Sequence, residues 1–294
     1  MHPMSDTLTT SRIRTTMEGL GRRVGAGRVA ELLEELQADP LWGRAHIDLE
    51  QRLWRKTGMD PAFSNHMKRV NQVVADRLWS KMTPREFNRH WKGLEDKDRI
   101  ELLQKVVDLQ ARLYGVETVP LNIKPLPDTQ GIVYIRGQYR PDQRDILINS
   151  DPERDVWKDG PGVLALALHE GAHAVQHRLV DRLEAGDIVQ GHPWYDQARL
   201  FRASFNMVSL CEKKDVGIRI WNYFVIPTER HGHAVERHIK RAGRKASIAR
   251  IFSPAPDDMT WLVKSLAKPA PQDLSPPQVD ADRPPPDPGD KPRI

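Results

Sequence analysis

Residues 162–177 read Gly162-Val-Leu-Ala-Leu-Ala-Leu-His-Glu-Gly-Ala-His-Ala-Val-Gln-His177, an apolar run that leads into an HExxH motif. Positions four apart lie on one face of an α-helix, so the imidazoles of His169 and His173 can reach one ion. Glu170 follows the first histidine and can hold a water molecule beside that ion. Because two neutral imidazoles and a carboxylate favour Zn²⁺, the motif predicts a zinc site.

The residues around the motif predict a buried helix. Asp159 is an N-cap candidate, Pro161 suits the first turn, and Gly186 follows the last helical residues. The apolar residues before the motif cover most sides of the helix. Two histidines and a glutamate are costly to bury on such a helix without a partner, and a metal ion supplies one. An HExxH motif also occurs by chance, so the helical context carries the prediction.

The position of the third ligand has to be found elsewhere, since a catalytic zinc site usually takes three protein ligands and one open position. The metzincin continuation is excluded, because it needs glycine and histidine where this chain has Gln176 and Leu179. His177 is excluded because it lies about 12 Å along the helix axis from His169, too far for one ion to bridge. We therefore expect the third ligand downstream of the motif helix.

Glu229 is the expected third ligand, because it follows an apolar stretch and Pro227 and opens a predicted helix. His233, one turn later, is the alternative ligand, and it could instead support the site or donate a hydrogen bond to the transition state. Tyr223 and His231 are further candidates for that donor. The other downstream candidates for a ligand are Glu184, His192, Glu212, His231 and Glu236.

The chain resembles gluzincin-type zinc metallopeptidases in two segments, His169-Glu-Gly-Ala-His-Ala-Val-Gln176 and Ile226-Pro-Thr-Glu-Arg-His-Gly-His-Ala-Val235. More narrowly, it is similar to the HExxHxxQ domains of bacterial toxin, effector and phage-associated proteins, in which a later Pro-x-Glu helix supplies the third ligand. The resemblance covers residues 131–240. It implies a zincin-like fold with His169, His173 and Glu229 as ligands. That family often has an acidic residue where this chain has His233.

These features predict a peptidase, of the bacterial effector or toxin kind, that binds one Zn²⁺ ion. Zinc-bound water activated by Glu170 would hydrolyse the peptide bonds of a protein or peptide substrate. The alternative is an inactive, zinc-stabilised module that docks an acidic partner or nucleic acid through the basic segment 237–250. Nucleic acid is the less favoured partner, and a solvated helix face explains the basic segment more simply.

The fold class expected is α+β and mostly helical, with a zincin-like core. A β-hairpin is expected from residues 131–137 and 146–149, and it could hold an extended peptide or be only structural. Residues 218–226 fit a buried strand or a helix equally well. We expect a disordered N-terminus (1–10), a helical accessory region (11–115), the metallopeptidase domain (116–267) and a disordered proline-rich tail (268–294). Within the helical region, Thr83-Pro84-Arg85-Glu86 predicts a helix start with a capping box, and Gly115 predicts the end of another helix.

Composition limits the remaining alternatives. The formal charge is +5, and the basic residues concentrate in the segment that follows His231. Cys211 is the single cysteine of the chain, which excludes an internal disulfide and favours a small core residue. Neither a secretory signal nor an apolar run of membrane-spanning length is present, so we expect a soluble protein, cytoplasmic or exported without a signal peptide. The oligomeric state stays open.

Overall fold

The computed structural model describes residues 15–16, 24–38, 47–126, 135–151, 156–211, 226–250, 256 and 258–274. The chain divides into two compact units, each made of separate segments. The first unit comprises residues 1–65, 179–230 and 277–294, and the second comprises residues 66–178 and 231–276. Three helices contain the points at which the chain passes from one unit to the other: α4 (Pro61–Trp79), α7 (Gly160–Glu184) and α10 (Pro227–Ala249).

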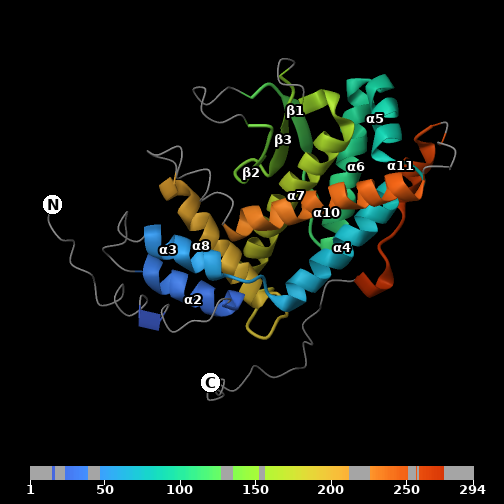
Figure 1. The fold of residues 1–294 in the computed structure, drawn as a ribbon. Helices are drawn as coiled ribbons and strands as arrows, with labels where there is room; N and C mark the ends of the chain where they lie inside the picture. Colours follow the sequence, from blue (N-terminus) through green and yellow to red (C-terminus); the bar gives the residue numbers. More distant parts are fainter. Residues whose placement is uncertain are drawn as a thin grey trace. The chain divides into compact units, whose positions relative to one another are not determined.

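The first unit is helical in its described part. It contains α2 (Ala26–Gln37), α3 (Ile47–Lys56) and α8 (Tyr195–Cys211), and α2 packs against α8 (Figure 1). Gly27 permits this packing, because a Cβ atom there would lie 2.4 Å from the carboxylate of Asp196. Gln37 donates a hydrogen bond of 2.9 Å to the carbonyl of Ala203. Glu34 accepts from both Arg199 and Arg202, so polar contacts border the apolar packing on this side.

Helices α5 (Pro84–Gly93) and α6 (Asp96–Tyr114) begin and end where their sequence indicates. Thr83 and Glu86 form the expected capping box at the start of α5, with both reciprocal hydrogen bonds present. Gly115 ends α6 in the left-handed conformation, with φ of 63°, as the sequence predicts for a glycine C-cap. The second unit also contains η3 (Val156–Lys158), α11 (Thr260–Ala267) and η4 (Gln272–Leu274).

The second unit holds a three-stranded sheet in the order β1-β3-β2, with β1 (Leu121–Lys124), β2 (Gly137–Arg140) and β3 (Asp145–Asn149). The hairpin expected ahead of the motif helix is present, because β2 pairs antiparallel with β3. Its first strand is later than expected: residues 139–140, assigned to the turn from the sequence, belong to β2. Residues 131–134 lie outside the described residues. Strand β1 adds a parallel pairing with β3 that the sequence did not indicate.

The mostly helical α+β class is confirmed, and the structure describes residues 268–274 at the start of the tail that was expected to be disordered. Leu274 in η4 is 2% exposed, and backbone carbonyls of the segment 268–274 accept hydrogen bonds from Arg69 and Arg77 of α4. One buried leucine and these arginine contacts order a segment that its proline content marked as disordered. Residues 275–294 and 1–10 lie outside the described residues. In the described part, every helix is too short or too polar to cross a bilayer.

Candidate metal centre

The motif lies where the sequence places it, in the middle of the 25-residue helix α7. His169 and His173 occupy successive turns, and their Nε2 atoms lie 3.2 Å apart. A tetrahedral zinc ion with ligands at about 2.0–2.1 Å would hold two ligand atoms about 3.3–3.4 Å apart. His169 is 5% exposed, so this pair lies at the edge of the buried core. The separation of the two nitrogens therefore fits a shared ion.

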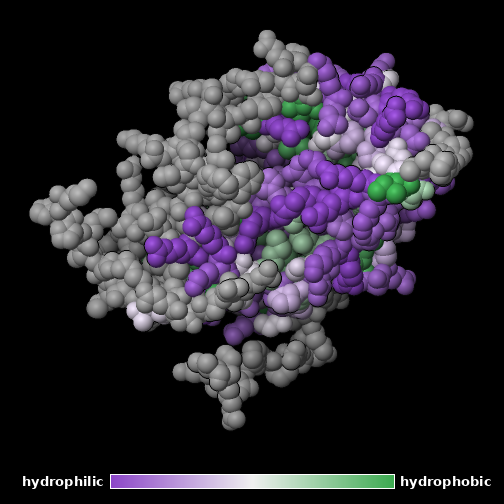
Figure 2. Space-filling view, in the orientation of Figure 1, coloured by the Kyte–Doolittle hydropathy of each residue, from purple (hydrophilic) through white to green (hydrophobic). Residues whose placement is uncertain are grey.

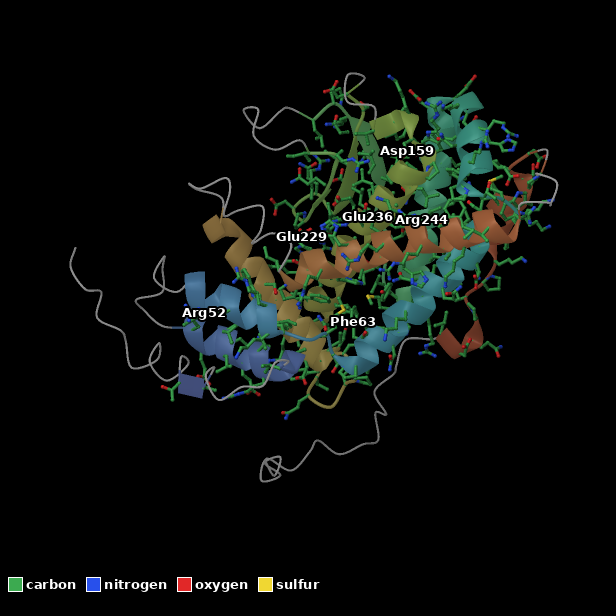
Figure 3. All side chains as sticks on the ribbon, in the orientation of Figure 1. Arg52, Phe63, Asp159, Glu229, Glu236 and Arg244 are labelled. Atoms are coloured by element: carbon green, nitrogen blue, oxygen red, sulfur yellow. The ribbon has the colours of Figure 1, made fainter. Side chains whose placement is uncertain are left out.

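Helix α10 presents a polar face on which Glu229, His233 and Glu236 follow at intervals of four and three residues. Figure 3 shows Glu229 and Glu236 along this helix, with Glu229 nearer its start. Gly232 lies on the same face, and a Cβ atom there would come within 2.8–2.9 Å of three ring atoms of His169. The missing side chain lets the backbone of α10 approach the imidazole directly.

Two overlapping groups of side chains could hold an ion, and both contain His169. One group adds His173 and Glu229; the other adds His233 and Glu236. In each group one ligand atom per residue lies within 4.8 Å of the others. Glu229 lies in the first turn of α10, and His233 follows four residues later on the same continuous helix. The two side chains therefore lie on one face of the helix, about one turn apart.

Glu236 fits a supporting role better than that of a ligand. Its Oε2 atom accepts from Nδ1 of His233 at 3.2 Å, and its Oε1 atom is paired with Lys240. The hydrogen bond from His233, followed by that from Lys240, lowers the pKa of Glu236 to about 2. The same Oε2 atom lies 3.9 Å from Nδ1 of His169, on the side of the ring away from His173. A carboxylate on this side is the arrangement that orients metal-binding histidines.

Glu170, the expected base, is 6% exposed and accepts a 2.9 Å hydrogen bond from the backbone N–H of Tyr139 in β2. Gly137, two residues earlier, allows α7 to come close to the strand, because its Cβ would lie 3.3 Å from Cγ of Glu170 and 3.2 Å from Cγ of Leu166. The ring of His177 packs against that of Tyr139, with 5.1 Å between the centroids. The hairpin therefore positions Glu170 through its backbone.

A buried hydrogen-bond chain supports His173 from the side opposite His169. Its Nδ1 lies 3.0 Å from Oε1 of Gln176, whose Nε2 lies 2.9 Å from Nδ1 of His231. Nε2 of His231 lies 3.3 Å from the hydroxyl of Tyr114 at the end of α6. Burial first, and then the nearby His173 and His169, lowers the pKa of His231 to about 3, so this imidazole is neutral. Burial also raises the pKa of Tyr114.

The second unit thus brings together His233 and the three motif residues, and Glu229 lies one helical turn before His233 on α10. Tyr223 lies outside the described residues, and its proposed role as a donor stays a prediction. His231 is 0% exposed and bonded to Gln176 and Tyr114, which removes it from the candidates for a donor to substrate.

Sequence reasoning did not assign roles to Glu236, Gln176 or Tyr114. The spacing of Glu229, His233 and Glu236 on one helical face was the signal that could have indicated a supporting role for Glu236. Gln176 lies three residues after His173, a helical spacing at which the two side chains meet. Tyr114 is brought to the site by tertiary packing alone, and no local pattern in the sequence indicates it.

Comparison of the chain with protein-family models, with curated protein sequences and with solved structures found no match. The resemblance to gluzincins and to HExxHxxQ domains therefore stays a prediction that rests on the motif residues.

Proposed function

We propose that the protein is a zinc-dependent peptidase with a zincin-like core. His169, His173 and Glu229 would hold one zinc ion, and the resemblance to gluzincins implies the same three residues. The observation that carries the proposal is the 3.2 Å separation of the two Nε2 atoms of His169 and His173 on one helix. A third ligand of this kind leaves a tetrahedral ion one position for water or substrate.

Bound zinc would supply Lewis-acid chemistry, making a water more acidic and polarising the scissile carbonyl. Glu170 would take the proton from that water and pass it to the leaving amine. The N–H of Tyr139 holds one oxygen of the Glu170 carboxylate, which fixes the side chain while the other oxygen serves as the base. Among the described residues, His233 is the candidate for contact with the developing oxyanion: its Nδ1 donates to Glu236, and only a ring that also carries a hydrogen on Nε2 could donate to the oxyanion.

Strand β2 supports a peptide as the substrate class, because it is one of the two edge strands of the described sheet. The N–H of Tyr139 points to Glu170 and not to β3. In an antiparallel strand the N–H and carbonyl of one residue point to the same side, so the carbonyl of Tyr139 also points away from β3. Gly137, two residues away, shares that direction. An extended substrate could pair with these backbone groups, so the edge offers a reason for the choice of peptides.

The test is hydrolysis of an unfolded protein, such as reduced casein, by zinc-loaded wild type and by Glu170→Gln. The proposal predicts cleavage that a chelator abolishes and that Glu170→Gln lowers by about 10²–10⁴-fold. Cleavage that persists unchanged in Glu170→Gln would contradict the role of Glu170 and point to a contaminating protease.

An inactive, zinc-stabilised binding module is the second candidate, and the surface of α10 favours it. The exposed cations of this helix are Arg237, Lys240, Arg241, Arg244 and Lys245, and Figure 2 shows a hydrophilic surface along it. A cavity of about 380 Å³ is lined by Arg244 and Lys240 together with Arg85 of α5. These charges suit an acidic partner. Salt-sensitive binding of an acidic peptide, equal in wild type and Glu170→Gln, would support this candidate.

A further inference from the structure

The hydrogen-bond chain from His173 to Tyr114 has a direction, and this direction bears on metal binding. An amide side chain has one acceptor and one donor end, and a neutral imidazole has one of each as well. Gln176 presents Oε1 to Nδ1 of His173 and Nε2 to Nδ1 of His231. The orientation of one amide therefore determines which nitrogen carries the proton in both rings.

In the observed orientation, Nδ1 of His173 must carry a hydrogen, because it donates to the amide oxygen at 3.0 Å. The lone pair of this ring then lies on Nε2, the atom that faces Nε2 of His169 at 3.2 Å. Nδ1 of His231 accepts from Gln176, so Nε2 of His231 carries the hydrogen and donates to Tyr114. This direction leaves His173 ready to bind a metal.

The reverse orientation would pair the same groups but would block the metal. With the amide turned over, its NH₂ group would donate to Nδ1 of His173, and the ring hydrogen would move to Nε2. His231 would then donate from Nδ1 and accept from the hydroxyl of Tyr114 at Nε2. A protonated Nε2 on His173 has no lone pair for an ion, so the two directions differ in whether the site can bind.

Burial makes these hydrogen bonds hard to replace. Gln176, His231 and Tyr114 are each 0% exposed, so water cannot take the place of a lost partner. Gln176 and His173 are three residues apart on α7, whereas His231 comes from α10 and Tyr114 from the end of α6. These hydrogen bonds therefore connect His173 to residues of α10 and α6 in the same unit.

We propose that Gln176 is a positioning residue that fixes His173 in the tautomer with a free Nε2, and that His231 and Tyr114 complete the buried hydrogen bonds of the Gln176 amide in this orientation. The inference rests on the proposed zinc site. It assigns to Gln176 a role in metal affinity, exerted through the orientation of its amide, without contact with substrate.

Three variants separate this role from simple packing. Gln176→Leu removes both ends of the amide. Gln176→Glu keeps an acceptor for Nδ1 of His173 and accepts from His231 as well, which would move the hydrogen of His231 from Nε2 to Nδ1. Gln72→Leu is the matched control, since Gln72 is exposed on α4 and its amide donates to Asp76.

The measurement is zinc affinity by competition with a chelator, with far-UV circular dichroism as a check on folding. We expect Gln176→Leu to weaken binding by about 10–100-fold, as loss of such supporting partners does. Gln176→Glu should bind within a few-fold of wild type or more tightly, and Gln72→Leu should match wild type. Equal zinc affinity in wild type and a folded Gln176→Leu would overturn this inference but not the proposed function. Equal losses of zinc affinity in Gln176→Leu and Gln176→Glu would do the same.

Long-range ¹⁵N NMR of the imidazoles supplies a readout that needs no substitution. The zinc-loaded wild type should show His231 with its hydrogen on Nε2, and Gln176→Glu should show it on Nδ1. A wild type with the hydrogen on Nδ1 of His231 would overturn the inference even if Gln176→Leu failed to fold. A wild type that binds no zinc would overturn the proposed function and this inference together.

Discussion

The Nε2 atoms of His169 and His173 face each other at 3.2 Å from successive turns of α7. Each ring has a partner at its other nitrogen: Gln176 lies beside Nδ1 of His173, and Glu236 lies 3.9 Å from Nδ1 of His169. The two Nε2 atoms thus face one point from a rigid helix. This pairing is the basis for the predictions that concern the site.

Glu170→Gln should keep zinc and lose activity. The amide oxygen of glutamine can still accept from the N–H of Tyr139, so the contact with β2 and the fold are expected to persist. Peptide hydrolysis should fall by about 10²–10⁴-fold, because the proton acceptor is gone. Zinc content measures metal binding, thermal unfolding measures the stability of the fold, and cleavage of casein measures activity. Glu184→Gln, at the exposed end of the same helix, is the control and should behave as wild type.

Gly232→Ala should disturb the site by displacing His169. The added Cβ would lie 2.8–2.9 Å from ring atoms of this histidine, so α10 or the imidazole has to move. Overpacking of this kind costs about 1–3 kcal/mol, and we expect weaker zinc binding as well. Gly93→Ala is the matched control, because its Cβ would have no neighbour within 4 Å. Urea unfolding and zinc competition check both effects; equal results for the two variants would show that α10 does not pack on His169 as described.

Asp145→Asn should remove a pH-dependent part of the stability of the hairpin. The hydrogen bond from Arg140, aided by Asn122, lowers the pKa of Asp145 below its ordinary value of 3.8. A lowered pKa means that this stabilisation is present above about pH 4 and is lost as the pH falls through the folded-state pKa. We expect a loss of about 1–3 kcal/mol at pH 7 that vanishes in strong acid.

Urea unfolding of the wild type and Asp145→Asn between pH 2 and 7 measures this difference. Asp142→Asn, in the exposed turn of the same hairpin, serves as the control. A difference between wild type and Asp145→Asn that does not change with pH would contradict the assignment.

Leu274→Ala should destabilise the second unit although the residue lies in the proline-rich tail. Leu274 is 2% exposed, and truncation of a buried leucine costs about 2–5 kcal/mol. Val263→Ala on α11 removes a side chain that is 38% exposed, so its effect should stay within about 0.5 kcal/mol. Chemical denaturation distinguishes the two; equal, small effects would mean that the segment does not pack.

Local signals account for the parts of the fold that the sequence predicted correctly. The capping box of Thr83 and Glu86, the left-handed Gly115 and the four-residue spacing of His169 and His173 all act within one or two helical turns. Such patterns can be recognised without knowledge of tertiary contacts. For the same reason the positions of the motif residues on α7 were correct.

The features that the sequence missed depend on contacts between distant segments. Gly137 was expected to end the first strand, but it begins β2, at a point where an added Cβ would lie 3.2–3.3 Å from side-chain atoms of Leu166 and Glu170 on α7. Leu274 is a single apolar residue among prolines, and only its burial shows that the segment packs. Tyr114 reaches the site through the packing of its helix, which no spacing in the chain reveals.

The most direct test of the central claim is the zinc content per chain, measured by mass spectrometry of the native protein for wild type, Glu229→Ala and Glu236→Ala. We predict one zinc ion in wild type, retention in Glu236→Ala and loss in Glu229→Ala, because we propose Glu229 as a ligand and Glu236 as a support for His169. Absence of zinc from the wild type would contradict the account. Retention in Glu229→Ala together with loss in Glu236→Ala would place the ion in the other group, with His233.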